Sequence, residues 1–259
     1  MNYQSVLVTG GSGFIGNHLL KKMPGATNID MKEGQNICDE LPDINFQYVF
    51  HLAASKSVAQ SEADPQRFIL NNCWGTTNVL RKYKNARVIN VSSSSANQVR
   101  SVYGATKAFG EMIGDMHGNC INARLYNVFG EGQLPESGAV VPTFISHVLD
   151  GKSPPIYGSG IQERDFTYVG DVVDYLHYLM FSTFKIGLVH VGYSDSISVL
   201  QLLQVICNLV GKTVMPEFLP RRAFEIENSK APYEVMSGIG RLSGLKLTVK
   251  WFQDGCPKT

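Results

Sequence analysis

The sequence has few cysteines, and they are not arranged to form a crosslink or a metal site. Its five cysteines are Cys38, Cys73, Cys120, Cys207 and Cys256, an odd number with no Cys-x-x-Cys pair. This pattern is typical of reduced thiols and argues against a disulfide framework or a zinc site. We therefore predict a cytoplasmic protein with no bound metal.

Long hydrophobic runs and an excess of one charge are also missing. The sequence contains no run of about 18 apolar residues, which predicts no membrane span. The start, MNYQSVLVTGG, has no basic region followed by an apolar run, so we expect no signal peptide. Lys plus Arg number 23 and Asp plus Glu number 22. This balance argues against nucleic acid as the main partner, because neutralising phosphates requires a basic surface.

Apolar residues are abundant enough for a large core. Of the 259 residues, 44% are hydrophobic and 17% are charged. Such a composition excludes a disordered chain. The length suits one large α/β domain, or one with a small C-terminal lobe.

Strand-like and helix-like segments alternate over the first half of the chain. Short apolar runs predict strands at 5–9, 26–30, 46–52, 86–92 and 121–126, and helical spacing predicts helices at 14–23, 65–84 and 102–116. This order predicts an α/β fold with a Rossmann-type, doubly wound parallel sheet covered on both faces.

After about residue 130 the pattern becomes mixed. Prolines and glycine-rich turns interrupt it, and helices are predicted at 141–150, 170–181 and 199–210. We predict a first domain over 1–130, plus part of 165–195, and a smaller mixed C-terminal lobe over 131–259 that binds substrate.

A glycine-rich turn joins the first predicted strand to the first helix. The segment TGGSGFIG spaces Gly10, Gly13 and Gly16 three residues apart. Small residues permit a tight turn and let a pyrophosphate approach the backbone, while the helix N-terminus offers N–H groups and a positive dipole end. The motif therefore predicts a dinucleotide site.

An acidic residue stands where such sites select their dinucleotide. Asp30 lies twenty residues after Gly10, at the end of the second predicted strand. A carboxylate there can hold a ribose 2′-hydroxyl and repels a 2′-phosphate, so we predict NAD as the cofactor. Lys32 follows closely and weakens the preference for NAD over NADP.

A tyrosine and a lysine occupy one face of a predicted helix. Tyr103 and Lys107 are four residues apart in YGATK. A phenol is a poor base at neutral pH, but a neighbouring ammonium and the positive charge of an oxidised nicotinamide would favour the phenolate. The pair then suits removal of a proton from a sugar hydroxyl while hydride leaves the same carbon. The serines at 92–95 end the strand just before, where a hydroxyl could bind the same oxygen.

These segments resemble the extended short-chain dehydrogenase/reductase family, specifically its nucleotide-sugar epimerase/dehydratase branch. The resemblance runs over nearly the whole chain. It rests on TGGSGFIG, Asp30, HLAA at 51–54, NNCWGTTNVL around Asn72, SSS at 92–94, YGATK, RLYNVFG at 124–130 and IYGSGIQERDFTYVGDVV at 156–173. The last two segments are far more specific than the glycine turn.

The resemblance implies which residues contact NAD. In this family the glycines and the first helix bind the pyrophosphate, the acid binds the adenosine ribose, and later residues line the rest of the cofactor. The implied set is Gly10, Gly13, Phe14, Ile15, Gly16, Asp30, Asn36, Ile37, Leu52, Ala53, Ala54, Lys56, Asn72, Tyr103 and Lys107.

Catalytic and substrate-binding residues follow from the same resemblance. The implied catalytic residues are Ser94, Tyr103 and Lys107, with Ser93 as the alternative serine. The implied sites for a UDP-sugar or other nucleotide-sugar are Ser94, Asn127, Arg164 and Arg222. Arg222 lies in PRRAFE, which resembles a late Arg-Pro-Gly-Asp motif of the family; Arg221 is the alternative register.

The residues after the serine favour one of the family's reactions. Dehydratases resembling this chain carry an Asp-Glu pair there, and decarboxylating relatives place a Glu nearby. Here the residues are Ser95, Ala96 and Asn97. We therefore expect an NAD-dependent epimerase of carbohydrate metabolism or polysaccharide biosynthesis, which oxidises carbon 4 of a UDP-hexose and returns the hydride. The alternatives are an NADP-dependent keto-sugar reductase and a non-catalytic NAD-binding scaffold.

Four further residues have structural interpretations. We expect His51 to be a structural histidine under the cofactor and Arg124 to pair with a core carboxylate. We expect Asp165 to join an ion pair and Asp171 to cap a helix.

Two features bear on assembly and activity. Members of this family pair the helices equivalent to 65–84 and 102–116 in a dimer, so we expect a homodimer, with Trp74 and Phe109 as apolar candidates. Tyr103 lies nine residues after Ser94, where relatives have a longer loop. The short segment could leave an open pocket, a different substrate or an inactive protein.

Overall fold

The first half of the chain folds into a parallel sheet. The structure, a computed structural model, describes residues 3–184, 186–224, 226–233 and 236–256. The strand order is β10-β5-β4-β3-β1-β2 and every neighbouring pair is parallel. The strands are β1 Val6–Thr9, β2 Thr27–Ile29, β3 Tyr48–His51, β4 Arg87–Ser93, β5 Cys120–Leu125 and β10 Gly187–Val191. The order reverses direction at β1, so the predicted doubly wound α/β fold is confirmed.

The chain divides into two compact units. Unit 1 comprises Met1–Leu125 and Val173–Val191, and unit 2 comprises Tyr126–Val172 and Gly192–Thr259. The sheet belongs to unit 1. Which part binds cofactor and which binds substrate stays a prediction.

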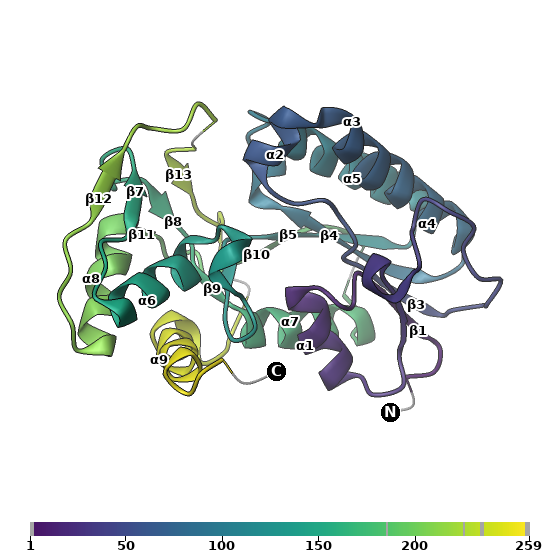
Figure 1. Cartoon of the computed structure of the whole chain (residues 1–259). Helices are drawn as coiled ribbons and strands as arrows, with labels where there is room; N and C mark the ends of the chain where they lie inside the picture. The colour runs from purple at the N-terminus through teal and green to yellow at the C-terminus, as the bar shows by residue number, and fades with distance from the viewer. Residues whose placement is uncertain (1–2, 185, 225, 234–235, 257–259) are drawn as a thin grey trace. The chain divides into compact units, whose positions relative to one another are not determined.

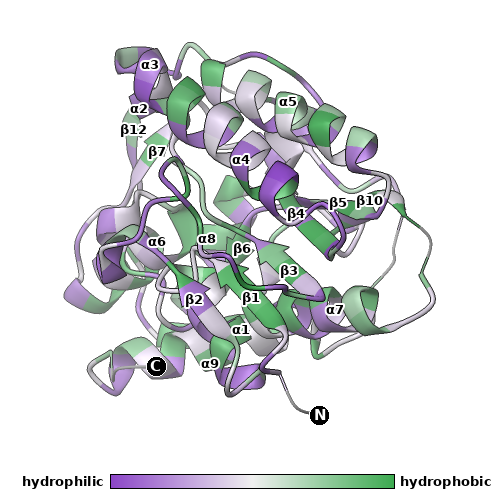
Figure 2. Ribbon diagram, turned by 90° about the vertical axis from the view of Figure 1, so that its right-hand side faces the viewer, coloured by the Kyte–Doolittle hydropathy of each residue, from purple (hydrophilic) through white to green (hydrophobic). Residues whose placement is uncertain are grey.

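Helices cover both faces of the sheet of unit 1. Figure 1 shows α4 (Gly75–Lys82) and α5 (Val102–His117) on one face, with α1 (Phe14–Lys22) and the end of α7 (Val169–Phe181) on the other. All four residues of β1 and most residues of β3, β4 and β5 are buried, and Figure 2 shows the hydrophobic colouring of β1 and β4. This double coverage explains why the strands read as continuous apolar runs.

The helix predicted at 65–84 consists of an α-helical, a π-helical and a second α-helical segment. It begins as α3 (Pro65–Phe68), continues as a π-helix, η2 (Ile69–Trp74), and ends as α4. A short helix, α2 (Val58–Ala63), precedes it. The π turn buries the side chain of Asn72, which bonds to the Ser55 backbone and to Thr106. Wide turns of this kind are frequent at functional sites, and residue spacing alone does not reveal them.

Unit 2 is built on three helices and several very short strands. The helices are α6 (Val140–Asp150), α8 (Val199–Val210) and α9 (Gly240–Gln253). They enclose a core that includes Phe144, Phe166 and Leu202. The paired strands are β6 Val128–Phe129 with β9 Thr167–Tyr168, β7 Pro155–Tyr157 with β12 Glu217–Leu219, and β8 Glu163–Arg164 with β11 Ile197–Ser198 and β13 Asn228–Ser229.

Two buried aspartates hold unit 2 together through the backbone. Asp171 accepts the N–H groups of Ile239 and Gly240, so it caps a helix as predicted, although the helix is α9 and not its own. Asp165 accepts the N–H groups of residues 193, 194 and 231. The ion pair predicted for Asp165 is therefore replaced by backbone hydrogen bonds. Burial raises the pKa of Asp165.

The described part of the chain contains no helix that is both long enough and apolar enough to span a membrane.

Candidate active site

The glycine turn has the geometry of a dinucleotide cradle. Gly10 has a φ of +75°, and a Cβ there would lie 2.6 Å from the backbone nitrogen of Ala53. A Cβ on Gly16 would lie 2.2 Å from the carbonyl oxygen of Gly10. Gly13 precedes α1 and no side chain caps that helix end. The N-terminus of α1, which starts with Phe14 and Ile15, can therefore face an anion such as a pyrophosphate.

The acid predicted to select NAD is tied to this turn. Asp30 accepts the N–H groups of Ser12, at 3.0 Å, and of Lys32, at 2.9 Å. Glu33 accepts the Ser12 hydroxyl at 2.8 Å, so a second carboxylate lies beside the turn. The Lys32 ammonium donates to the Ser12 carbonyl oxygen at 3.0 Å. Two carboxylates outnumber one ammonium here, which favours a ribose hydroxyl over a 2′-phosphate.

We expect Asp30→Ala to weaken NAD binding more than NADP binding, because the carboxylate both holds ribose hydroxyls and repels the extra phosphate. Calorimetric titration of the apoprotein with each dinucleotide measures the two affinities. Lys32→Ala, which keeps both carboxylates, is the matched control. Equal losses for both cofactors, in a protein that already prefers NADP, would refute the assignment.

The other residues assigned to NAD surround the same edge of unit 1. Ala53 and Leu52 lie against Gly10 through their backbones. The Asn36 side chain accepts the N–H group of Cys38, and Ile37 is buried against Gly75. Burial and the charge of Lys32 lower the pKa of Lys56. Ala54 lies in the loop that follows β3. Direct contacts of these residues with NAD stay predictions.

His51 is a buried, neutral histidine. Its Nδ1 lies 2.7 Å from the Thr9 hydroxyl and its Nε2 lies 2.9 Å from the Thr76 hydroxyl. Burial, helped by the charge of Lys107, lowers its pKa to about 3. This confirms the structural interpretation, since a base would need its pKa near neutrality.

His51 makes the folded state sensitive to acid. The folded pKa is depressed, so between pH 6.5 and about 3 the unfolded chain binds a proton that the folded chain excludes. We expect the free energy of unfolding to fall by about 1.4 kcal/mol for each pH unit below 6.5 from this residue. Urea unfolding at pH 7 and pH 5 measures the effect. A His51→Gln variant with the same slope as wild type would contradict it.

Helix α5 carries Tyr103 and Lys107, and three side chains hydrogen-bond the backbone N–H groups at its N-terminus. Ser101 caps its N-terminus, and α2 supplies two further acceptors: Glu62 for the Val102 N–H group and Ser61 for the Tyr103 N–H group. A Cβ on Gly104 would lie 2.7 Å from the Ser95 carbonyl oxygen, so only glycine lets the helix approach the serine-bearing turn.

The serine that reaches Tyr103 is Ser93. Its hydroxyl interacts with the phenol and lowers the pKa of Tyr103. Ser93 is the last residue of β4, whereas Ser94 begins the 3-10 helix η3 (Ser94–Ala96) one residue later. Of the two serine registers, this effect on the phenol pKa favours Ser93 over Ser94.

Burial shifts the pKa values of both Tyr103 and Lys107. Burial raises the pKa of the Tyr103 phenol, and the interaction with Ser93 lowers it. The Lys107 ammonium donates to the Val91 carbonyl oxygen at 2.6 Å, and burial lowers its pKa to about 8. Burial is the largest effect on the phenol pKa, and the expectation that Lys107 lowers this pKa stays a prediction. The positive charge of bound NAD would stabilise the phenolate further.

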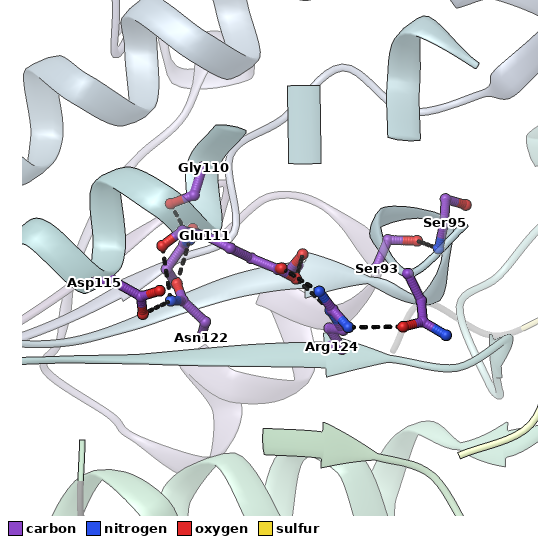
Figure 3. Close-up of polar contacts among 10 residues, drawn as sticks. Ser93, Ser95, Gly110, Glu111, Asp115, Asn122 and Arg124 are labelled. Atoms are coloured by element: carbon purple, nitrogen blue, oxygen red, sulfur yellow. Dashed lines mark hydrogen bonds and ion pairs between the residues drawn. The ribbon is translucent and has the colours of Figure 1, made fainter. Parts of the chain in front are cut away.

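A network of polar side chains connects α5 to strands β4 and β5 (Figure 3). Arg124 donates to both carboxylate oxygens of Glu111, at 2.7 and 2.6 Å, which confirms its predicted pairing with a core carboxylate. The Ser92 hydroxyl donates to the same carboxylate at 2.6 Å. Glu111 was not predicted from the sequence, although it lies one helical turn after Lys107 on the same face.

Unit 2 contains a separate cavity of about 430 Å³. Its lining includes the three residues of unit 2 predicted to bind substrate, Asn127, Arg164 and Arg222. The Arg222 guanidinium lies 3.7 Å above the ring centre of Tyr157. Arg221 instead pairs with Glu227 and does not line the cavity, so the register with Arg222 is the supported one.

The chemistry of this cavity suits an anionic, hydrogen-bonding ligand. Arg164 and Arg222 supply two positive charges, and none of the residues that line the cavity in the described chain is acidic. The Asn127 Nδ2 and Gln133 Oε1 atoms are buried and have no hydrogen-bond partner among the residues that the structure describes. A donor, an acceptor and two cations are what a nucleotide diphosphate requires.

Comparison with known proteins agrees with this geometry. The profile of the NAD dependent epimerase/dehydratase family matches residues 6–187. A Methanocaldococcus jannaschii protein provisionally named a UDP-glucose 4-epimerase is 32% identical, over 80% of this chain and 82% of that protein. The UDP-glucuronic acid decarboxylase 1 of Danio rerio is 26% identical, over 95% of this chain and 72% of its own length.

A solved structure is similar to nearly the whole chain. The UDP-N-acetylglucosamine 4-epimerase from Methanobrevibacter ruminantium, in complex with UDP-N-acetylmuramic acid, is similar with a TM-score of 0.88 and 29% identity. The match covers 98% of this chain and 100% of that one. The family profile covers more than half of the chain and names NAD, which confirms both the resemblance and the cofactor. The chain belongs to the NAD dependent epimerase/dehydratase family.

Proposed function

We propose that the protein is an NAD-dependent epimerase that inverts carbon 4 of a UDP-hexose. The observation that carries the proposal is the grouping of Ser93, Tyr103 and Lys107 at one end of β4 and α5. The relatives named as UDP-sugar 4-epimerases support it.

Each of the three side chains has a distinct part in the proposed reaction. Bound NAD supplies a hydride acceptor that later returns the hydride. Tyr103 accepts the proton of the hydroxyl on carbon 4 and returns it after the keto sugar has rotated to present its other face. Ser93 donates a hydrogen bond that orients the reacting oxygen. Lys107 holds the cofactor's ribose and adds positive charge near the phenol.

The cavity of unit 2 is the proposed site for the nucleotide. Arg164 and Arg222 would bind the diphosphate, because guanidinium groups match phosphate oxygens in geometry and charge. Asn127 would donate its unpartnered amide N–H to the same ligand. The apolar lining residues Val140, Phe144 and Val199 leave room for a flat base.

The residues after the serine separate epimerisation from the other reactions of the family. Ser95, Ala96 and Asn97 bring no carboxylic acid to the turn. Glu62 reaches the start of α5, but its carboxylate already accepts the Val102 N–H group there. Elimination of water needs both an acid and a base beside the sugar ring, so this arrangement supports simple oxidation and hydride return.

A panel of UDP-sugars tests the proposal. Purified protein is incubated with UDP-glucose, UDP-N-acetylglucosamine and UDP-glucuronic acid without added cofactor, and the products are separated by chromatography. Conversion of at least one sugar to its 4-epimer is expected. Loss of CO₂ from UDP-glucuronic acid, or a 4-keto-6-deoxy product, would assign a decarboxylase or dehydratase instead.

We also propose that the protein is a homodimer formed by η2 and α5. Both helices expose large apolar side chains, including Met112 at 62% and Met116 at 79%; the set is Ile69, Leu70, Trp74, Phe109, Met112 and Met116. A twofold interface would use this face twice. Light scattering at micromolar concentration should give twice the mass of one chain, and Met112→Lys should lower it. Met215→Lys, an exposed position of unit 2, is the control. A single-chain mass for wild type would contradict the proposal.

A further inference from the structure

The Glu111–Arg124 ion pair joins α5, which carries Tyr103 and Lys107, to β5. Its side chains are only 9% and 13% exposed, so the charges are largely removed from water. A buried ion pair is a weak source of stability, because desolvation offsets most of the attraction. The contacts of this pair therefore call for another explanation.

Those contacts converge on the end of β4. The Glu111 carboxylate accepts the Ser92 hydroxyl at 2.6 Å, and Ser92 is the residue before Ser93. Lys107, one helical turn before Glu111, holds the Val91 carbonyl oxygen at 2.6 Å. The final residues of the strand are thus bonded to α5 at two successive positions.

Arg124 extends the same support to the turn that follows. Its Nη1 donates to the Asn97 side-chain oxygen at 3.1 Å, at the end of η3. Strand β5, which carries Arg124, pairs with β4 through Ser92. Ser93 therefore lies between residues that the pair fixes on both sides.

We propose that the Glu111–Arg124 pair positions the catalytic group, by fixing the serine-bearing end of β4 against α5 and by placing a negative charge beside the Lys107 ammonium. Glu111 and Arg124 are positioning residues in this proposal, because neither is assigned a contact with substrate or cofactor. The proposal rests on the function proposed above.

The charges around Lys107 support the second half of the proposal. His51 on β3, Cys73 on η2 and Glu111 on α5 face it. Burial lowers the pKa of Lys107, whereas Glu111 is the largest influence raising it and Cys73 raises it further. His51 stays neutral near pH 7 because its own pKa is about 3. His190 and Arg124 are further charged or titratable groups beside Glu111.

The direct test is to titrate Lys107 itself. Isotope-labelled lysine side chains are followed by NMR against pH, and the Lys107 signal is identified by its loss in Lys107→Met. Glu111→Gln should lower the Lys107 pKa by about one unit, because an opposite charge nearby is removed. Asp115→Asn is the matched control: Asp115 bonds Asn122 from the same helix, one turn further from Lys107. It should leave the titration unchanged.

A second variant tests the positioning of the strand end. Ser92→Ala removes one hydrogen bond to Glu111 and leaves the ion pair in place. We expect kcat to fall about 10-fold to 10²-fold with little change in KM, because small misplacements of reacting groups cost this much. The Lys107 pKa should stay at its wild-type value.

The outcomes separate this proposal from the proposed function. An unchanged Lys107 pKa in folded Glu111→Gln would overturn the charge role, and an unchanged kcat in Ser92→Ala would overturn the positioning role. A wild-type protein that turns over no UDP-sugar counts against the function, while the titration still decides the charge role. If Glu111→Gln does not fold, Ser92→Ala decides the proposal.

Discussion

Replacing Tyr103 by phenylalanine is expected to lower epimerase turnover by ~10²–10⁴, the usual contribution of a general acid–base group. The substitution keeps the aromatic ring, which packs edge-on against Phe68, so the fold should survive. NAD should still bind, because the glycine turn and Asp30 are untouched. Turnover is measured by chromatography of the UDP-hexose pair, and NAD content by denaturing the protein and assaying the supernatant.

Two comparisons sharpen this prediction. Ser93→Ala should reduce turnover less than Tyr103→Phe if the serine only orients the oxygen, and Ser94→Ala should have the smaller effect of the two serine variants. Wild-type activity should fall as the pH drops, because burial raises the Tyr103 pKa and the base form is lost first at low pH. A Tyr103→Phe protein that is folded, holds NAD and turns over at nearly the wild-type rate would exclude the proposed mechanism.

Lys107→Met should cost both turnover and NAD affinity, because the proposed role of Lys107 includes the cofactor's ribose and the phenol. We expect a loss within the ~10²–10⁴ range in turnover and a measurable rise in the NAD dissociation constant. The contrast with Tyr103→Phe, which spares NAD, distinguishes the two residues. Equal NAD affinity in Lys107→Met and wild type would show that Lys107 does not hold the cofactor's ribose.

Lys107 also changes how stability depends on pH. Its folded pKa of about 8 lies below the value of 10.5 for an unperturbed lysine. Between these values the unfolded chain binds a proton that the folded chain has released, so the wild-type free energy of unfolding should rise with pH in that window. The Lys107→Met variant should lack this rise, as urea unfolding at pH 8 and pH 10 would measure.

Much of unit 1 follows from local patterns in the sequence. The strand and helix positions are readable because parallel strands buried on both faces are continuous apolar runs, and because the helices between them carry an apolar face. The glycine turn and Asp30 are readable for a related reason: their chemistry depends on backbone conformation and spacing within one strand–turn–helix segment. The Tyr103–Lys107 pair is likewise local, since four residues form one helical turn.

The parts that could not be read depend on contacts between distant segments. The choice of Ser93 over Ser94 depends on where β4 ends relative to Tyr103, and element ends are poorly determined by sequence patterns. The role of Glu111 requires knowing that β4 and β5 bring Ser92 and Arg124 to it. The π turn that buries Asn72 departs from the helical spacing of the sequence pattern. The raised pKa of Tyr103 follows from burial, which cannot be deduced from the four-residue spacing of Tyr103 and Lys107.

The most direct test of the central claim follows the hydrogen on carbon 4. A UDP-hexose carrying deuterium at that carbon is incubated with the wild-type protein in ordinary water without added cofactor. Transient oxidation by NAD and hydride return predicts a 4-epimer that retains the deuterium at carbon 4. A 4-epimer that has exchanged its deuterium for solvent hydrogen, or no epimer from any UDP-hexose while NAD is bound, would contradict the account.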